Sequence, residues 1–258
     1  YPSALLLILT YFVVVVAFNE VQNWGVTSLR FLFVMITATI VFAGVMRWQI
    51  KLEFPYLDLK LFQNRIYRTV SMARPFFQFN FGAFFFILPL YLHNIVGMTA
   101  EDSGLVMLIM TLALALSSTI IGRLNDHISP AGPMIIAHLL SIVGFVILAL
   151  MPIVPIHWPI FSVALICIGA NIGIMYSTTN YAVIHSLPAD KKGVGYGFFT
   201  ANAYLFYSIG IAMTGYLLST IGLSQFNHAI AAHFGQNSHL LNSQSLMLYT
   251  NGAHPIKN

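Results

Sequence analysis

Seven apolar stretches, each near the length needed to cross a lipid bilayer, constrain this chain most strongly. A membrane-spanning helix needs about 20 largely apolar residues. The stretches cover residues 3–18, 28–46, 73–92, 103–121, 133–151, 158–184 and 193–221. Charged residues make up only 7% of the 258 residues, whereas soluble domains carry roughly 25%. We therefore predict an all-α integral membrane protein with about seven transmembrane helices.

The basic residues gather in alternate loops. Nine of the 11 Lys and Arg residues lie in the segments 47–74, 122–132 and 185–192, while the other side holds only Arg30 and Lys257. Lys and Arg concentrate on the cytoplasmic side of membrane proteins. We therefore expect the chain to start in the cytoplasm and the tail 222–258 to lie outside. The net charge of +4 then reflects topology, and we expect no nucleic-acid partner.

Four short motifs follow one another along the chain. They are Asn19-Glu-Val-Gln-Asn-Trp-Gly25, Pro55-Tyr-Leu-Asp-Leu-Lys-Leu-Phe62 with Asn64-Arg65, Leu88-Pro-Leu-Tyr-Leu92 with Gly97 and Gly104, and Gly122-Arg-Leu-Asn-Asp126. In order and spacing they resemble the major facilitator superfamily, specifically its fourteen-helix drug:proton antiporter branch of the EmrB/QacA type. The resemblance covers about residues 1–200.

The resemblance implies a partial major facilitator fold in the bacterial cytoplasmic (inner) membrane. Residues 1–46 would be the central extra helix pair, and residues 73–221 would be five helices of the C-terminal bundle. The N-terminal bundle and the last helix would be missing. Residues 47–72 would form a cytoplasmic linker and residues 222–258 an extracytoplasmic tail, with a short helix expected near residues 229–233.

The linker has one helical feature of its own. Leu57, Leu61 and Phe62 fall on one face of a helix. This spacing suits a helix that lies on the membrane surface. An ordinary loop that touches the surface is the alternative.

Polar side chains within the spans identify a candidate binding cavity, because such groups usually face a bundle interior or cavity. The candidates are Gln78, Phe81 and Phe85 on one helical face of the third span, Asn171 and Thr178 on the sixth, and Tyr204, Tyr207 and Ser208 on the seventh. An amide among aromatic rings suits flat lipophilic or cationic compounds. Two alternatives remain open: the phenylalanines pack against lipid and other helices, and Asn171 bonds a neighbouring helix. The resemblance places these spans around the central cavity of the family.

Gly122, Arg123 and Asp126 match the family's cytoplasmic loop motif, in which the acidic residue steadies one conformation. Here His127 replaces the usual basic residue and the end of the motif departs from the pattern. Simple capping of the next helix by Asp126 is the alternative to a gating role.

Acidic residues decide whether this chain could couple transport to protons. All seven fall in loops or at helix ends, and the resemblance places the coupling carboxylates in the N-terminal bundle. His138 is the most interior titratable side chain, and we interpret it as structural. We find no catalytic constellation, metal site or cofactor motif, so an enzyme is not expected.

The sequence therefore predicts the C-terminal portion of a proton-coupled multidrug or hydrophobic-solute efflux transporter. Its expected partners are the lipid bilayer, small lipophilic or cationic solutes, an N-terminal bundle or companion chain, and a periplasmic adaptor. The alternative is a non-transporting remnant, or a membrane scaffold or partner subunit from a broken or split transporter gene. The sequence does not identify the substrate.

Overall fold

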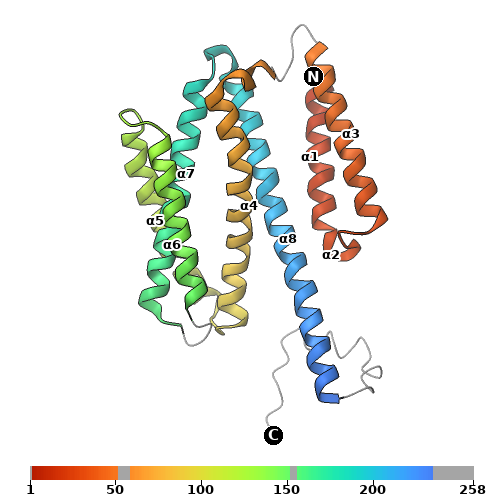
Figure 1. The fold of residues 1–258 in the computed structure, drawn as a ribbon, viewed down its shortest axis with the longest axis vertical. Helices are drawn as coiled ribbons and strands as arrows, with labels where there is room; N and C mark the ends of the chain where they lie inside the picture. Colours follow the sequence, from red (N-terminus) through yellow and green to blue (C-terminus); the bar gives the residue numbers. More distant parts are fainter. Residues whose placement is uncertain (1, 52–58, 152–155, 235–258) are drawn as a thin grey trace. The chain divides into compact units, whose positions relative to one another are not determined.

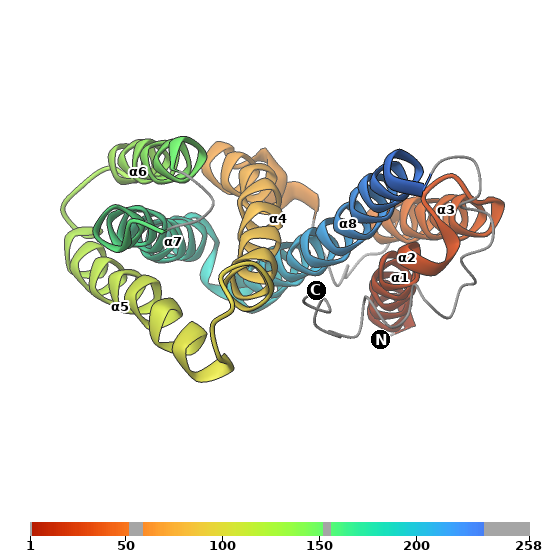
Figure 2. The ribbon, with the colours of Figure 1, turned by 90° about the horizontal axis from the view of Figure 1, so that it is seen from below.

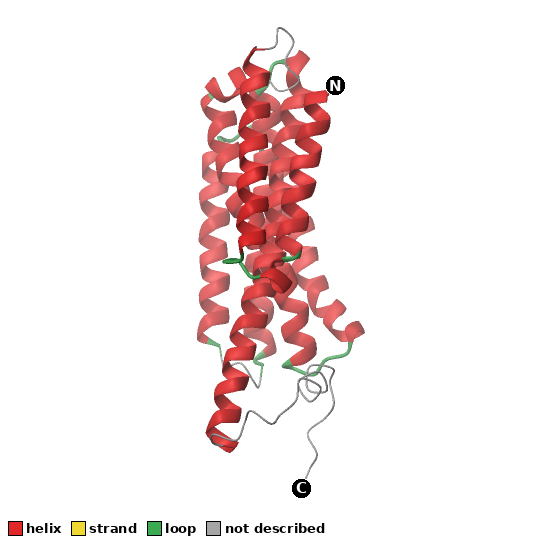
Figure 3. Ribbon diagram, turned by 90° about the vertical axis from the view of Figure 1, so that its right-hand side faces the viewer, coloured by secondary structure: helices red, strands yellow, loops and turns green. Residues whose placement is uncertain are grey.

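The computed structural model describes residues 2–51, 59–151 and 156–234, and all regular structure in these ranges is helical (Figures 1 and 3). The elements are α1 (Pro2–Asn19), α2 (Val21–Trp24), α3 (Leu29–Lys51), η1 (Leu59–Gln63), α4 (Arg65–Asn94), α5 (Ala100–Leu124), α6 (Ala131–Leu150), α7 (Trp158–Ser186), η2 (Ala189–Lys191) and α8 (Lys192–Phe234). The chain divides into two units, residues 1–214 and 215–258. The contacts that form the candidate site all lie within the first unit.

The predicted all-α membrane fold is confirmed. Among the described residues, six helices are long and apolar enough to cross a membrane, and Leu5–Asn19 is an apolar part of α1. The short helix α2 follows α1, and Gly25 then turns the chain with a φ of 78°. This left-handed conformation favours glycine because it has no Cβ.

Two helices are longer than the sequence suggested. Helix α4 begins at Arg65 rather than at residue 73, so Arg74, which we counted in the cytoplasmic segment 47–74, lies well inside a helix. Asn64 caps the start of this helix, because its side-chain oxygen accepts hydrogen bonds from the N–H groups of Ile66 and Tyr67 at 2.9 and 3.2 Å. Its amide nitrogen donates a hydrogen bond to the Ser186 carbonyl at 3.0 Å. Helix α8 continues to Phe234. The helix expected near residues 229–233 is therefore part of α8, and residues 222–234 are helical rather than loop.

The described part of the linker packs on the bundle. Residues 59–63 form the short 3₁₀ helix η1, in which Leu61 is buried. Phe62 makes edge contacts with Tyr67 and Phe198 at 5.2 and 6.0 Å. This part therefore faces protein rather than the membrane surface that we expected. Leu57, the third member of the expected surface-lying face, lies outside the described residues.

Close backbone contacts between helices depend on four glycines. Figure 2 shows α7 flanked by α5 and α6. A Cβ on Gly169 would lie 2.2 Å from the Met110 carbonyl oxygen of α5, and one on Gly173 would lie 2.2 Å from that of Leu114. Helices α4 and α8 approach in the same way, since Gly82 faces the Tyr207 carbonyl and Gly210 faces the Phe79 carbonyl. Small residues allow such contact between membrane helices.

We expect Gly173→Ala to lower the thermal unfolding midpoint of the detergent-solubilised protein. The new methyl group would force α7 away from α5, and overpacking of this kind costs about 1–3 kcal/mol. Gly44→Ala on α3 is the matched control, because a Cβ there meets nothing within 4 Å. It should leave the midpoint unchanged or raise it, since alanine favours a helix interior over glycine by about 1 kcal/mol. Equal midpoints for the two variants would contradict this account.

Candidate functional site

The tenth residue of α4, Arg74, places a guanidinium inside the helix bundle. Its side chain is only 3% exposed. Nη1 donates a hydrogen bond to the Met175 carbonyl oxygen of α7 at 3.4 Å and another to the Thr179 hydroxyl. Thr179 in turn donates to the Met175 carbonyl at 2.5 Å. The guanidinium, which stays charged at any physiological pH, is thus held against one turn of α7.

Three aromatic rings surround the same group. The Arg74 Cζ lies 4.2 Å from the ring centroid of Tyr176 and 5.5 Å from those of Phe77 and Phe199. A cation over an aromatic face is attracted by the ring quadrupole. The groups in these contacts are neutral: the Met175 carbonyl, the Thr179 hydroxyl and three rings, of which Tyr176 also brings its hydroxyl near the charge. No carboxylate among the described residues forms a salt bridge with it.

Gln78 lies one turn beyond Arg74 on the same face of α4. It is completely buried, yet neither atom of its amide meets the geometry of a hydrogen bond. The hydroxyl of Tyr176 is the polar group that lies beside it. The Nε of Arg74 is also buried without a hydrogen-bond partner. Buried polar atoms are almost always paired in folded proteins. Several unpaired atoms at one interface therefore indicate a site where a bound molecule could form the missing hydrogen bonds.

Phe81 joins the polar residues to an aromatic surface. Its ring lies 5.4 Å from those of Phe85 and Tyr207, 6.1 Å from that of Tyr176, and 6.4 Å from that of Phe77. We call the following residues the Arg74 cluster: Arg74, Phe77, Gln78, Phe81, Phe85, Tyr176, Thr179, Phe199 and Tyr207. They come from α4, α7 and α8.

The structure brings together some of the predicted cavity residues. Gln78, Phe81, Phe85 and Tyr207 all belong to the Arg74 cluster. Tyr204 is 55% exposed and lies within electrostatic range of Arg74 and Tyr176, at the edge of the cluster.

Three other predicted residues lie elsewhere. The Asn171 amide donates to the Ala137 carbonyl oxygen of α6 at 2.8 Å, so the alternative that it bonds a neighbouring helix is confirmed. Thr178 is fully buried with an unpaired hydroxyl, and Ser208 is half-buried. No ring contact or hydrogen bond connects either residue to the Arg74 cluster. Whether any of the predicted residues contacts a solute stays a prediction.

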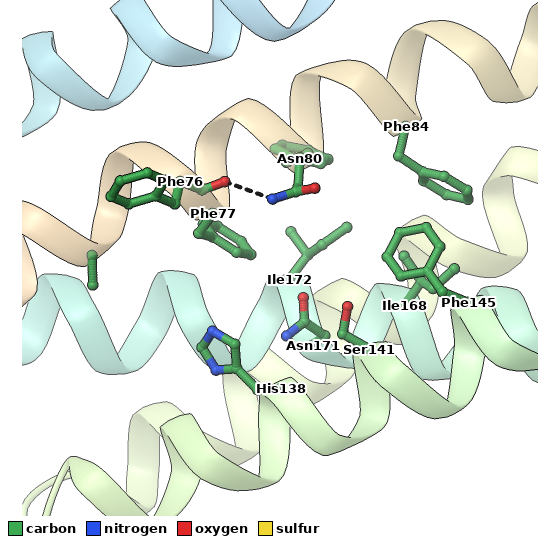
Figure 4. Close-up of a pocket in the computed structure, with 12 residues that line it drawn as sticks. Phe76, Phe77, Asn80, Phe84, His138, Ser141, Phe145, Ile168, Asn171 and Ile172 are labelled. Atoms are coloured by element: carbon green, nitrogen blue, oxygen red, sulfur yellow. Dashed lines mark hydrogen bonds between the residues drawn. The ribbon is translucent and has the colours of Figure 1, made fainter.

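A pocket of about 450 Å³ lies between α4, α6 and α7, and Phe77 and Phe81 of the Arg74 cluster form part of its wall (Figure 4). Asn171 and His138 line it, together with Asn80 and several phenylalanines. Asn80 donates to the Phe76 carbonyl at 2.9 Å, and His138 Nδ1 lies 2.7 Å from the Met134 carbonyl oxygen. These side chains are thus bonded to backbone carbonyls, which agrees with the structural interpretation of His138.

A second pocket, an open groove of about 660 Å³, is lined by α1, α3, α4 and α8. Its walls are mainly apolar, and Tyr11 and Asn202 form one polar contact there, 3.4 Å from hydroxyl to amide oxygen. The groove lacks the charged and unpaired polar groups that distinguish the Arg74 cluster.

The predicted gating residues lie where α5 meets α7. Gly122 and Arg123 belong to the last turn of α5 rather than to a loop. Asn125 donates to the Ser177 hydroxyl at 3.1 Å, and the exposed Asp126 lies close enough to Tyr181 to interact with it electrostatically. Asp126 does not cap α6, because Pro130 occupies the N-cap position. The capping alternative is therefore wrong, while the gating role stays a prediction.

Sequence reasoning missed Arg74 because it was counted among the basic residues of the cytoplasmic segment 47–74. Removing it leaves eight Lys and Arg residues on the expected cytoplasmic side against two, so the orientation argument is unchanged. Its four-residue offset from Gln78 is the signal that could have identified it. Tyr176 and Thr179 stand out in the sequence only as polar residues of an apolar span, and nothing local distinguishes Phe199.

Comparison with known proteins now decides the family. The model of the Major Facilitator Superfamily matches residues 2–211. The chain belongs to the major facilitator superfamily. This family consists of membrane transport proteins rather than enzymes, which agrees with the prediction from the sequence.

Three curated relatives are similar at low identity. The riboflavin transporter RibZ of Clostridioides difficile is 26% identical over 212 residues, which are 82% of this chain and 45% of the relative. The tetracenomycin C resistance and export protein of Streptomyces glaucescens is 22% identical, over 76% of this chain and 36% of the relative. A multidrug resistance protein B homolog of Mycobacterium tuberculosis is 26% identical, over 69% and 32%. The chain thus spans less than half the length of these relatives.

We expect Tyr176→Leu to destabilise the protein, because it removes the ring that lies over the buried Arg74 charge. A desolvated cation–π contact contributes about 2 kcal/mol. Tyr176→Phe keeps the ring and should retain most of the stability. Thermal unfolding in detergent measures both. An equal loss for the two variants would mean that the hydroxyl, and not the ring, stabilises the site.

Proposed function

We propose that this chain supplies the solute-binding helices of an efflux transporter for flat, lipophilic solutes, with export coupled to protons. The Arg74 cluster is the observation that carries this proposal. It combines adjacent aromatic rings on α4, α7 and α8 with polar atoms that lack partners. The names of two relatives, which speak of multidrug resistance and tetracenomycin C export, support the direction of transport.

The physical basis is aromatic stacking in a site shielded from water. Phe81 touches four other rings, and each aromatic pair contributes about 0.5–1.5 kcal/mol beyond the burial of its area. Phe81 and Tyr207 are only partly buried, and Tyr204 beside them is largely exposed. A flat solute could therefore stack on this surface from the exposed edge, near Tyr204.

Proton coupling is the part of the proposal that we place outside the described helices. The described carboxylates, which are Glu20, Glu101, Asp102, Asp126 and Asp190, lie in loops or in the first turn of a helix. A coupling carboxylate is expected within the transport path. We therefore propose that an N-terminal bundle or companion chain supplies it, as in the fourteen-helix branch that the motifs resemble.

The same proposal sets the topology and the partners. The basic segments on one side of the membrane favour a cytoplasmic chain start and an extracytoplasmic tail in a bacterial inner membrane. The lipid bilayer surrounds the helices. A periplasmic adaptor stays a prediction from the resemblance.

Phe81→Ala should weaken the binding of a flat neutral probe, naphthalene-2-carboxamide, by about 10-fold, since tenfold corresponds to roughly 1.4 kcal/mol. Binding is measured by the change in probe fluorescence with the chain in phosphatidylcholine nanodiscs. Phe33→Ala is the matched control, because Phe33 on α3 is 71% exposed and lines neither of the two pockets described above. Equal affinities of the two variants would refute the role of the cluster.

A proton-flux measurement separates the transporter from the non-transporting scaffold. The purified chain is placed in proteoliposomes with an internal pH-sensitive dye, and naphthalene-2-carboxamide is added. We expect binding without proton flux, because no described carboxylate lies within a span. Flux would show that the coupling group is in this chain, with His138 the first residue to test. If the folded chain neither binds the probe nor moves protons, the scaffold function is favoured.

A further inference from the structure

We propose that Arg74 forms an anion subsite, which holds the carboxylate or an equivalent anionic group of a flat aromatic solute. The proposal rests on the function proposed above and narrows its substrate class. The described helices bury the positive charge of Arg74 but place no negative charge beside it, and the proposal follows from this observation.

Burying the charge of Arg74 costs free energy. An ionised side chain within a membrane helix bundle is expensive to bury and is normally paired. Arg74 is almost completely buried, and its partners are the Met175 carbonyl, the Thr179 hydroxyl and aromatic rings. These partners stabilise a cation but do not cancel its charge. An incoming anion would do so, and the pair would form where water does not screen it.

Arg74 and Gln78 have hydrogen-bonding groups that the protein does not use. Guanidinium groups bind carboxylates through two parallel N–H donors. The hydrogen bonds of Arg74 to Met175 and Thr179 come from Nη1, while Nε is buried and has no hydrogen-bond partner. Gln78, one turn away, contributes an amide whose two polar atoms also lack hydrogen bonds. Arg74 and Gln78 thus present donors side by side on α4.

The aromatic rings beside Arg74 form a surface for the ring system of the solute. Phe77, Phe81 and Tyr207 continue the cluster away from the guanidinium, and each ring contacts the next at 5.4–6.4 Å. A solute whose carboxylate reaches Arg74 would therefore rest its ring system on this aromatic surface. Tyr204 is largely exposed and lies within electrostatic range of Arg74, so it marks the side from which a solute arrives.

This assignment reverses one expectation from the sequence. Aromatic rings and an amide alone would suit a lipophilic cation. The guanidinium already occupies the face of Tyr176 and repels a second positive charge. The cluster therefore favours flat anions over flat cations of the same shape.

The experiment compares three probes that share one ring system: naphthalene-2-carboxylate, naphthalene-2-carboxamide and 2-naphthylmethylammonium. Affinities are measured by fluorescence with the chain in phosphatidylcholine nanodiscs, which supply no net anionic lipid. We expect the carboxylate to bind at least 10-fold more tightly than the carboxamide, and the ammonium compound to bind most weakly. Decanoate, a carboxylate without a ring, should displace the naphthoate poorly.

Variants then test the residue. Arg74→Gln should remove the preference for carboxylate over carboxamide, while Arg74→Lys should retain part of it as a point charge. Arg68→Gln is the matched control, because Arg68 is an exposed arginine on the same helix. It should leave the preference unchanged.

The outcomes are distinguishable. Equal binding of carboxylate and carboxamide by the unmodified chain overturns the anion subsite but leaves the proposed function intact, and this comparison needs no variant to fold. A preference that survives in Arg74→Gln also overturns it. Displacement of the naphthoate by decanoate at concentrations equal to the Kd of the naphthoate would refute the aromatic part. Failure of all three naphthyl probes to bind the folded chain overturns both proposals.

Discussion

Close backbone contact at glycine is the constraint on which the rest of this structure depends. Lipid provides no hydrophobic force that drives one apolar helix onto another, so packing and polar contacts decide which helices associate. Gly169 and Gly173 hold α7 against α5, and Gly82 and Gly210 hold α8 against α4. These contacts determine which side chains meet at the interface of α4, α7 and α8. The aromatic enclosure of Arg74 is a consequence of this packing.

The polar residues within the spans fall into two physical classes. Asn80, His138 and Asn171 line a pocket, and each is hydrogen-bonded to a backbone carbonyl of its own or a neighbouring helix. Arg74 and Gln78 instead keep buried atoms without hydrogen bonds, as does the hydroxyl of Thr178 outside the Arg74 cluster. Because unpaired polar atoms are costly in a medium of low dielectric constant, the second class is the one suited to bind a solute. The distinction depends on partners, which hydropathy does not reveal.

Much of the fold could be predicted, because the requirement for long apolar helices acts locally along the chain. The all-α membrane class was confirmed, and the family followed from four motifs in order. The start of α4 was missed because Asn64 caps it while also bonding Ser186, which is far away in sequence. Arg74 was missed for a related reason: a charge predicts a loop unless tertiary neighbours stabilise it, and those neighbours come from α7 and α8. Asp126 was considered as a helix cap, but Pro130 occupies the N-cap position of α6.

The sequence by itself determined that this chain is a helical membrane protein of the major facilitator superfamily, and where most of its spans lie. It also marked Gln78 and Phe81 as neighbours on one helical face, since the helical period fixes that relation. Only the tertiary structure decided that Tyr176 and Tyr207 join them, that Asn171 turns towards α6, and that Arg74 lies among them. The physical reason is that periodicity defines the faces of a helix but not its rotation against its neighbours. That rotation is fixed by the packing of whole helices, and with it the chemistry of the site.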